Sequence, residues 1–163
     1  MRQVPNARSE FTTGARAFVP LSMSIIPFGV VCGAAASTAG MTPLQALAMS
    51  WVIFAGSAQI AATQLFAGGA PLLVILATGA IVNLRFLMYG ASLAQHFRSL
   101  GRRWQMTIAY LLTDQAYALT VVHSTQHPDR QDHLHWFYLG LAGATWASWQ
   151  LATIAGILLG SLV

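Results

Sequence analysis

Two charged residues lie inside long apolar stretches of the sequence. Arg85 belongs to the run from Pro71 to Gln95, roughly 20 Å of helix from its start and about 15 Å from its end. A guanidinium keeps its proton, and insertion scales put its cost at mid-bilayer at roughly 2.5–3.5 kcal/mol. Asp114 is the only carboxylate elsewhere in a long apolar run, so we expect it to face Arg85. Such a pair predicts either a binding site for a substrate's carboxylate and ammonium groups or a link between two helices.

A second candidate site is the stretch FAGSAQ at residues 54–59, in the middle of another apolar run. A helix break there would expose backbone groups that bind charged substrate ends, with Gly56, Ser57 and Gln59 beside them. The alternative is close helix packing through small residues, with Gln59 bonded to a neighbouring helix. Asn83, two residues before Arg85, is a further candidate for substrate binding.

Three large side chains share one face of the last apolar run: Trp146, Trp149 and Gln150. The two tryptophans predict a pocket for an apolar substrate side chain. An aromatic belt at the membrane surface, or ordinary core packing, remains the alternative.

The sequence does not favour an enzyme. Ser57 has no histidine within an apolar segment to act as its base, and no carboxylate pair supports metal or aspartyl chemistry. No phosphate-binding GxxxxGK[ST] motif is present to support ATP drive. We therefore expect no catalytic residue, no metal and no cofactor. The histidines, which favour ordinary interfacial positions rather than metal-ligand spacing, are His96, His123, His127, His133 and His135.

Composition points to a membrane. Only 7% of the 163 residues are charged, against about 25% in soluble domains, and mean hydropathy is +0.60. The net charge of +4 comes entirely from arginine, which favours cytoplasmic loops and anionic lipid headgroups over nucleic acid. The sequence predicts an all-α, polytopic integral membrane helical bundle with about five apolar segments, some broken or re-entrant.

These segments define the expected organisation. We expect a polar N-terminal tail over residues 1–13 and a single transmembrane domain over residues 14–163. Thr42 predicts an N-cap, with Pro43 at the first helical position. The apolar segments are expected at residues 17–39, 44–67, 71–95, 106–122 and 134–163.

Arginine placement constrains the topology. Arginines cluster before the first segment and between the third and fourth, and both clusters should be cytoplasmic. An even number of crossings must then separate them, although three apolar segments lie between. We expect segment 44–67 to be a re-entrant pair of half-helices, since irregular backbone is tolerated where it lines a cavity. The alternative is that the charge rule is violated.

Five motifs together resemble the AzlC family of branched-chain amino acid exporters. They are PFG at 27–29, FAGSAQ at 54–59, NLRFLMYGASL at 83–93, LTDQAYAL at 112–119 and WASWQLATIAGILLGSL at 146–162. The resemblance implies the large permease subunit of a two-part exporter, working with a small hydrophobic AzlD-like subunit. It also implies a multi-pass protein of the bacterial inner membrane that exports valine, leucine, isoleucine or their analogues.

Two positions depart from the family pattern: Phe86 stands where the family commonly has histidine, and Gln115 where it commonly has glutamate. Each departure removes a titratable group near the expected site. Family members also usually continue with further apolar segments, so we expect a truncated or partial form.

The expected mechanism is secondary transport. The substrate carboxylate would meet Arg85 or the amides near Gly56 and Ser57, and its ammonium group would meet Asp114. Proton exchange through Asp114 would drive export. The rival interpretations are a channel or pore, and a non-transporting membrane assembly subunit.

Overall fold

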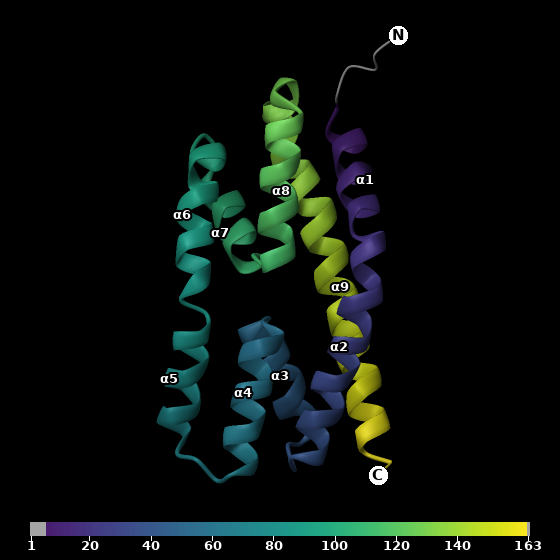
Figure 1. Cartoon of the computed structure of the whole chain (residues 1–163), viewed down its shortest axis with the longest axis vertical. Coiled ribbons are helices and arrows are strands. Elements are labelled where there is room, and N and C mark those ends of the chain that lie inside the picture. The colour runs from purple at the N-terminus through teal and green to yellow at the C-terminus, as the bar shows by residue number, and fades with distance from the viewer. Residues whose placement is uncertain (1–5, 163) are drawn as a thin grey trace. The chain divides into compact units, whose positions relative to one another are not determined.

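The computed structural model describes residues 6–162, and within that range every regular element is a helix (Figure 1). The predicted all-α fold is confirmed. The helices are α1 (Ala7–Ala17), α2 (Val19–Thr38), α3 (Pro43–Ile53), α4 (Gly56–Ala67), α5 (Leu72–Val82), α6 (Arg85–Phe97), α7 (Arg102–Tyr110), α8 (Asp114–Gln126), the 3₁₀ helix η1 (Pro128–His133) and α9 (Leu134–Gly160).

Local sequence sets where α3 begins. Thr42 Oγ1 accepts a hydrogen bond from Gln45 N (3.3 Å), and Gln45 Oε1 accepts one from Thr42 N (2.8 Å). This is a capping box, and Pro43 occupies the first turn, where no intrahelical donor is needed. The predicted N-cap is confirmed.

Three of the five predicted apolar segments are each broken into two half-helices. The first break, at Phe54–Ala55, puts Phe54 in the left-handed region, with φ 33° and ψ 46°. This conformation is unusual for a non-glycine residue and reverses the chain sharply. The second break lies at Asn83–Leu84 and the third at Leu111–Thr113. The prediction that some segments are broken is therefore confirmed.

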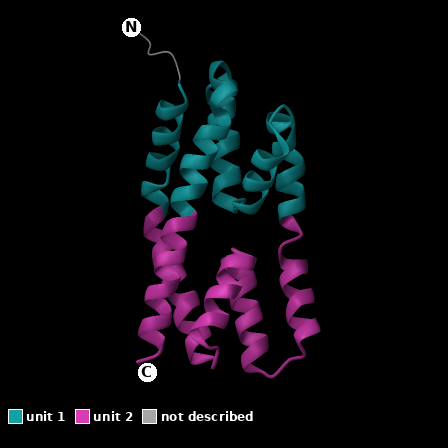
Figure 2. Ribbon diagram, turned by 180° about the vertical axis from the view of Figure 1, so that it is seen from behind, with its two compact units in different colours: residues 1–21, 86–145 teal, residues 22–85, 146–163 magenta. Residues whose placement is uncertain are grey.

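Two stretches have both the length and the hydropathy of a membrane span. Val19–Thr38 and Leu72–Phe97, the latter covering α5 and α6, are long and apolar enough to cross a bilayer. By contrast, α3 and α4 have 11 and 12 residues. Each therefore extends about 17–18 Å, well short of a hydrocarbon core about 30 Å thick. Figures 1 and 2 show α3 and α4 side by side as an antiparallel hairpin.

The chain divides into two compact units (Figure 2). Unit 1 comprises Met1–Leu21 and Phe86–Thr145, and unit 2 comprises Ser22–Arg85 and Trp146–Val163. The predicted domain bounds at residues 13 and 14 stay a prediction.

In unit 1, α1 packs closely on the first half of α9. A Cβ added at Gly14 would collide with the backbone of Phe137, and one at Gly140 would collide with the backbone of Phe11. Only glycine at these positions lets the two helices approach this closely. Part of the stretch expected to be an N-terminal tail is thus a packed helix; residues 1–5 lie outside the described range.

In unit 2, α2 packs on the second half of α9 in the same way. A Cβ at Gly33 would meet the backbone of Thr153, and one at Gly156 would meet the backbone of Val30. The buried core beside this contact includes Ala36 and Ile157. By contrast, only 6% of the apolar window in Leu72–Phe97 is buried, which leaves this stretch suited to contact with lipid.

Candidate functional site

The candidate site is built around the N-terminus of α4 in unit 2. The left-handed turn at Phe54 ends α3, and α4 begins at Gly56 without a side-chain cap from Ala55. The first amides of a helix have no intrahelical acceptors, and the helix dipole adds partial positive charge there. The predicted break in FAGSAQ therefore exposes the first amides of α4, at a helix end of the kind that can bind an anion.

Arg85 lies beside this helix end. Its Nη2 donates a hydrogen bond of 3.0 Å to Ser57 Oγ in the first turn of α4. Arg85 is half-buried and is the first residue of α6, directly after the break between α5 and α6. Two helix breaks, 28 positions apart in the sequence, thus place a guanidinium next to free helix amides. The structure brings together the predicted residues Ser57 and Arg85.

An aromatic wall lies against Gly56. The rings of Phe28 and Trp149 meet edge to face, with centroids 5.7 Å apart and planes at 72°. A Cβ at Gly56 would collide with both rings, so the backbone of α4 touches the wall directly. Sequence reasoning predicted Trp149 but missed Phe28, although the PFG motif at 27–29 was a signal.

Several buried polar atoms of unit 2 have no hydrogen-bond partner among the described residues. They include Gln59 Oε1, Asn83 Oδ1 and Trp149 Nε1. Gln59 is only 2% exposed, and Trp149 only 6%. Buried polar groups normally have a protein or water partner, so these atoms can serve a bound polar molecule. The buried hydroxyl oxygens of Thr63 and Thr153 also have no hydrogen-bond partner among the described residues, and the sequence analysis did not predict these two residues.

Trp146 and Gln150 instead connect α9 to α3. Trp146 meets Trp51 edge to face at 5.6 Å between ring centroids. Ser50 Oγ donates to Gln150 Oε1 (3.1 Å), and Gln150 Nε2 donates to Ser50 O (3.5 Å). These contacts support the packing alternative for both residues, and their role in substrate binding stays a prediction.

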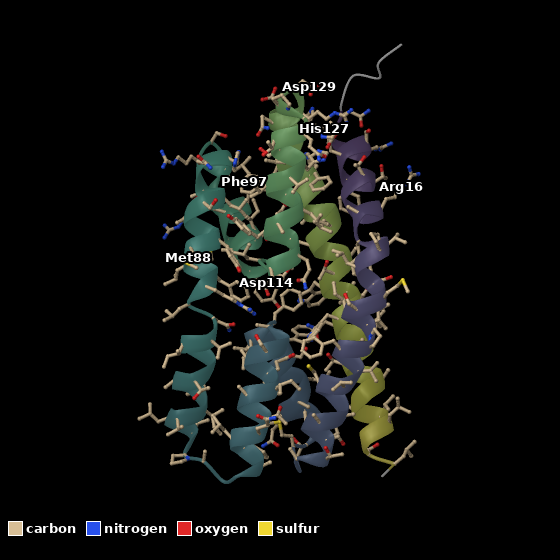
Figure 3. All side chains as sticks on the ribbon, viewed as in Figure 1. Arg16, Met88, Phe97, Asp114, His127 and Asp129 are labelled. Atoms are coloured by element: carbon tan, nitrogen blue, oxygen red, sulfur yellow. The ribbon has the colours of Figure 1, made fainter. Side chains whose placement is uncertain are left out.

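Asp114 lies at the start of α8 in unit 1 (Figure 3). Thr113 caps this helix, with its Oγ1 accepting a 3.2 Å hydrogen bond from Ala116 N. A carboxylate in the first turn is stabilised by the helix dipole. Arg85 belongs to unit 2, so its predicted contact with Asp114 stays a prediction.

By sequence spacing alone, Tyr110, Asp114 and Tyr117 are expected to share one helix face, and this expectation is wrong for Tyr110. Tyr110 ends α7, whereas Asp114 begins α8, so the two residues do not share a helix. Tyr117 does lie on α8, where its ring stacks on Tyr89 at 4.4 Å and its hydroxyl donates to Ser92 Oγ at 3.2 Å.

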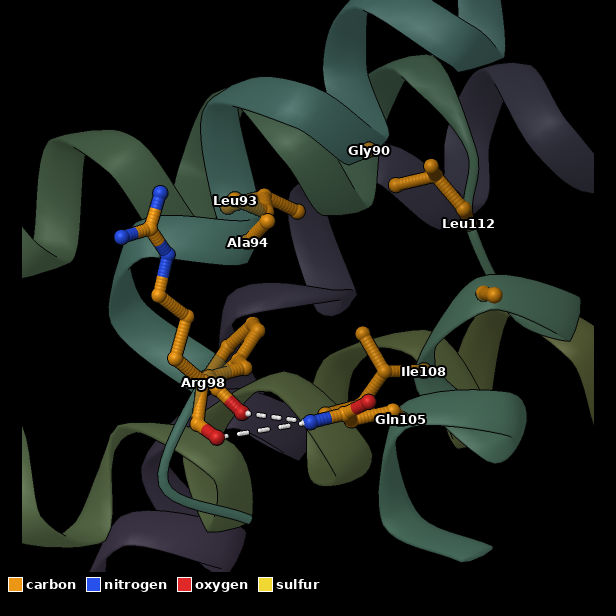
Figure 4. Close-up of a pocket in the computed structure, with 9 residues that line it drawn as sticks. Gly90, Leu93, Ala94, Arg98, Gln105, Ile108 and Leu112 are labelled. Carbon is orange, nitrogen blue, oxygen red and sulfur yellow. Dashed lines mark hydrogen bonds between the residues drawn. The ribbon is translucent and has the colours of Figure 1, made fainter. Parts of the chain in front are cut away.

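Unit 1 also contains an apolar pocket of about 230 Å³ between α6 and α7 (Figure 4). Leu93, Ile108 and Leu112 are among its lining residues. Gln105 Nε2 donates to the carbonyl oxygens of Phe97 and Arg98, both at 3.5 Å, which ties the start of α7 to the end of α6. None of the predicted site residues lines this pocket.

Comparison with known proteins identifies relatives. A family model described as AzlC protein matches residues 20–163. The inner membrane protein YgaZ of Escherichia coli K12 is 28% identical over 152 residues, covering 93% of this chain and 61% of the relative. An uncharacterized membrane protein of Archaeoglobus fulgidus is 31% identical over 142 residues, covering 87% and 59%. The branched-chain amino acid transport protein AzlC of Bacillus subtilis is 24% identical over 162 residues, covering 97% and 62%.

The chain therefore spans about three fifths of the length of these relatives, between 59% and 62%. No solved structure matches it. The relatives are named as membrane or transport proteins, and with the apolar helices described above they identify this chain as a membrane protein.

Proposed function

Because this chain belongs to the AzlC family, we propose that it is a secondary transporter that exports branched-chain amino acids. Family membership supports a role in membrane transport, and the name of the Bacillus subtilis relative supports the substrate class. We expect no enzymatic reaction from it. The proposed location is the bacterial inner membrane, because the Escherichia coli relative is named an inner membrane protein.

The observation that carries the proposal is the hydrogen bond from Arg85 to Ser57 at the N-terminus of α4. A carboxylate bound there accepts hydrogen bonds from the backbone amides of Gly56 and Ser57 and from the guanidinium. Charge-assisted hydrogen bonds of this kind are about twice as strong as neutral ones. The site therefore suits the invariant acidic end of an amino acid.

The rest of an amino acid is recognised by different groups. Phe28 and Trp149 contact an aliphatic side chain, which suits valine, leucine and isoleucine. Gln59 Oε1 and Asn83 Oδ1, which lack partners among the described residues, accept hydrogen bonds from the ammonium group. Asp114 exchanges the coupling proton in this proposal.

We also propose a small hydrophobic AzlD-like partner subunit. Large apolar side chains on α5 and α6 are exposed, among them Leu73, Leu76 and Leu87.

Export of labelled leucine from cells that express the chain, with and without a candidate partner, tests the proposal. We expect Arg85→Gln to abolish export while membrane insertion is unchanged. Arg103→Gln is the matched control, because it removes the same charge from an exposed position on α7 and should leave export intact. Full export by Arg85→Gln would refute the site. Leucine flux that does not saturate and shows no counterflow would indicate a channel. The absence of leucine flux under every condition would indicate an assembly subunit.

A further inference from the structure

A second cluster of titratable residues lies in unit 1, and none of its members is a site residue predicted from the sequence. Its centre is Glu10 of α1, whose side chain is fully buried at 0% exposure. Glu10 Oε2 lies 2.9 Å from His123 Nε2, and Glu10 Oε1 accepts a 3.0 Å hydrogen bond from Arg130 Nη1. The close contacts of Gly14 and Gly140 hold α1 against α9 beside this cluster.

The histidines form a short path towards solvent. The ring of His123 stacks on Phe137 at 3.8 Å and on His127 at 4.6 Å between centroids. His127 is half-buried, His123 is 7% exposed and Glu10 is inaccessible. Exposure thus falls stepwise from His127 to the buried carboxylate.

The charges around His123 bear on whether its ring binds a proton. Arg130 is permanently cationic and offsets the charge of ionised Glu10. His123 lies beyond the predicted apolar segment 106–122, and its burial lowers its pKa, while the hydrogen bond and charge of Glu10 act in the opposite direction. His127 and Arg130 disfavour a second positive charge there. The charged or titratable partners of Glu10 are His123 from α8 and Arg130 from η1. The residue of α9 that contacts His123 is Phe137, which carries no charge. His123 is therefore the group of this cluster at which we expect a proton to bind on acidification.

Helix α8 links this cluster to Asp114. His123 follows Asp114 by nine positions, which is about 13 Å along a helix and roughly half a turn around it, so the two residues lie on opposite faces of α8. Thr120 lies between them, fully buried, and its Oγ1 has no hydrogen-bond partner among the described residues. A buried hydroxyl in this condition is a typical position for an ordered water.

We propose that Glu10, His123 and His127 form a proton-binding site that exchanges protons with solvent in the export cycle. This inference rests on the proposed proton-coupled export, to which it adds the entry or exit point of the proton. Arg130 acts as a positioning residue that holds the Glu10 carboxyl group beside His123.

The test uses the purified full chain with ¹⁵N-labelled histidine, followed by NMR from pH 5 to pH 8. We expect His123 to gain a proton in this range, and Glu10→Gln to lower the midpoint by about one pH unit or more, since an attractive charge is lost. His127→Gln, a change at a half-buried position, should alter the His123 titration, whereas the control His133→Gln should not. A His123 ring that stays neutral throughout, or a midpoint that Glu10→Gln leaves unchanged, would show a purely structural contact and overturn the proposal.

The pH profile of leucine export provides the second readout. We expect His127→Gln to shift the acidic limb of the profile, whereas the control His133→Gln should leave the profile unchanged. An unshifted profile in a protein whose histidines titrate as expected would overturn the link to transport. Failure of the proposed carboxylate site would give a different result. In that case Arg85→Gln would leave export unchanged, while His123 would still titrate as expected.

Discussion

Gly56 is the residue at which the site is most tightly constrained. Its backbone lies against Phe28 and Trp149, and a methyl group there would overlap both rings. Gly68, at the other end of α4, offers ordinary contact distances to an added Cβ, the nearest atom being 3.5 Å away. The two glycines of one helix therefore differ in what surrounds them.

We expect Gly56→Ala to reduce leucine export at least about tenfold, because a displacement of roughly 1 Å in a binding site has effects of this order. Gly68→Ala, the matched control, should retain export. Expression and membrane insertion of both variants are followed by immunoblotting of membranes. Equal export by the two variants would show that the aromatic wall is not part of the site.

Glu10 was not predicted as a functional residue. The sequence around it is polar, and a single acidic residue in such a stretch is usually solvated. Its burial depends on Gly14 and Gly140, which let α1 dock on α9, and on partners 113 and 120 positions away. Contacts at this distance in sequence leave no local pattern.

We expect Glu10→Gln to lower stability by on the order of 2 kcal/mol. Breaking a fully buried ion pair costs about 3–5 kcal/mol, and the value here is reduced because the Arg130 side chain remains 32% exposed. Thermal unfolding in detergent provides the measurement, with the exposed Asp129→Asn as control. Identical unfolding midpoints for the two variants would contradict this role.

At the scale of elements, the sequence carried part of the information on the breaks. Gly56 and Ser57 indicated the break between α3 and α4, and Thr42 with Pro43 indicated the start of α3. The break at Leu111–Thr113 was missed because those residues continue an apolar run without glycine or proline. The available signal was Thr113 followed by Asp114, a capping residue and then an acidic first turn.

The α3–α4 hairpin also bears on topology. If it enters and leaves the membrane on one side, the N-terminal arginines and those between α6 and α7 share the other side. Cysteine labelling tests this in a chain whose native Cys32 is replaced by alanine. Ala70→Cys is preferable to a change at Gly69, whose φ of 68° suits glycine. We expect Ala70→Cys and Arg102→Cys to be labelled from opposite sides, and labelling from the same side would exclude a re-entrant hairpin.

At the scale of the whole molecule, the helical class and membrane character followed from composition, because few charges and apolar runs of about 20 residues are typical of membrane-spanning helices. The motifs indicated the AzlC family, which the comparisons confirm. The division into two units was not predicted, because it depends on which distant segments pack together. Unit 2 holds the proposed carboxylate site, and unit 1 holds Asp114 and the proposed proton site.

The central claim is that Arg85 and the start of α4 recognise the carboxylate of the substrate. Counterflow of labelled leucine in proteoliposomes, driven by unlabelled leucine or by leucine amide, which lacks the carboxylate, tests it directly. We predict that, for the unaltered chain with its partner subunit, leucine drives much more counterflow than leucine amide, and that in Arg85→Gln leucine drives no more counterflow than the amide. An Arg85→Gln protein that still discriminates leucine from its amide as well as the unaltered chain would contradict the claim.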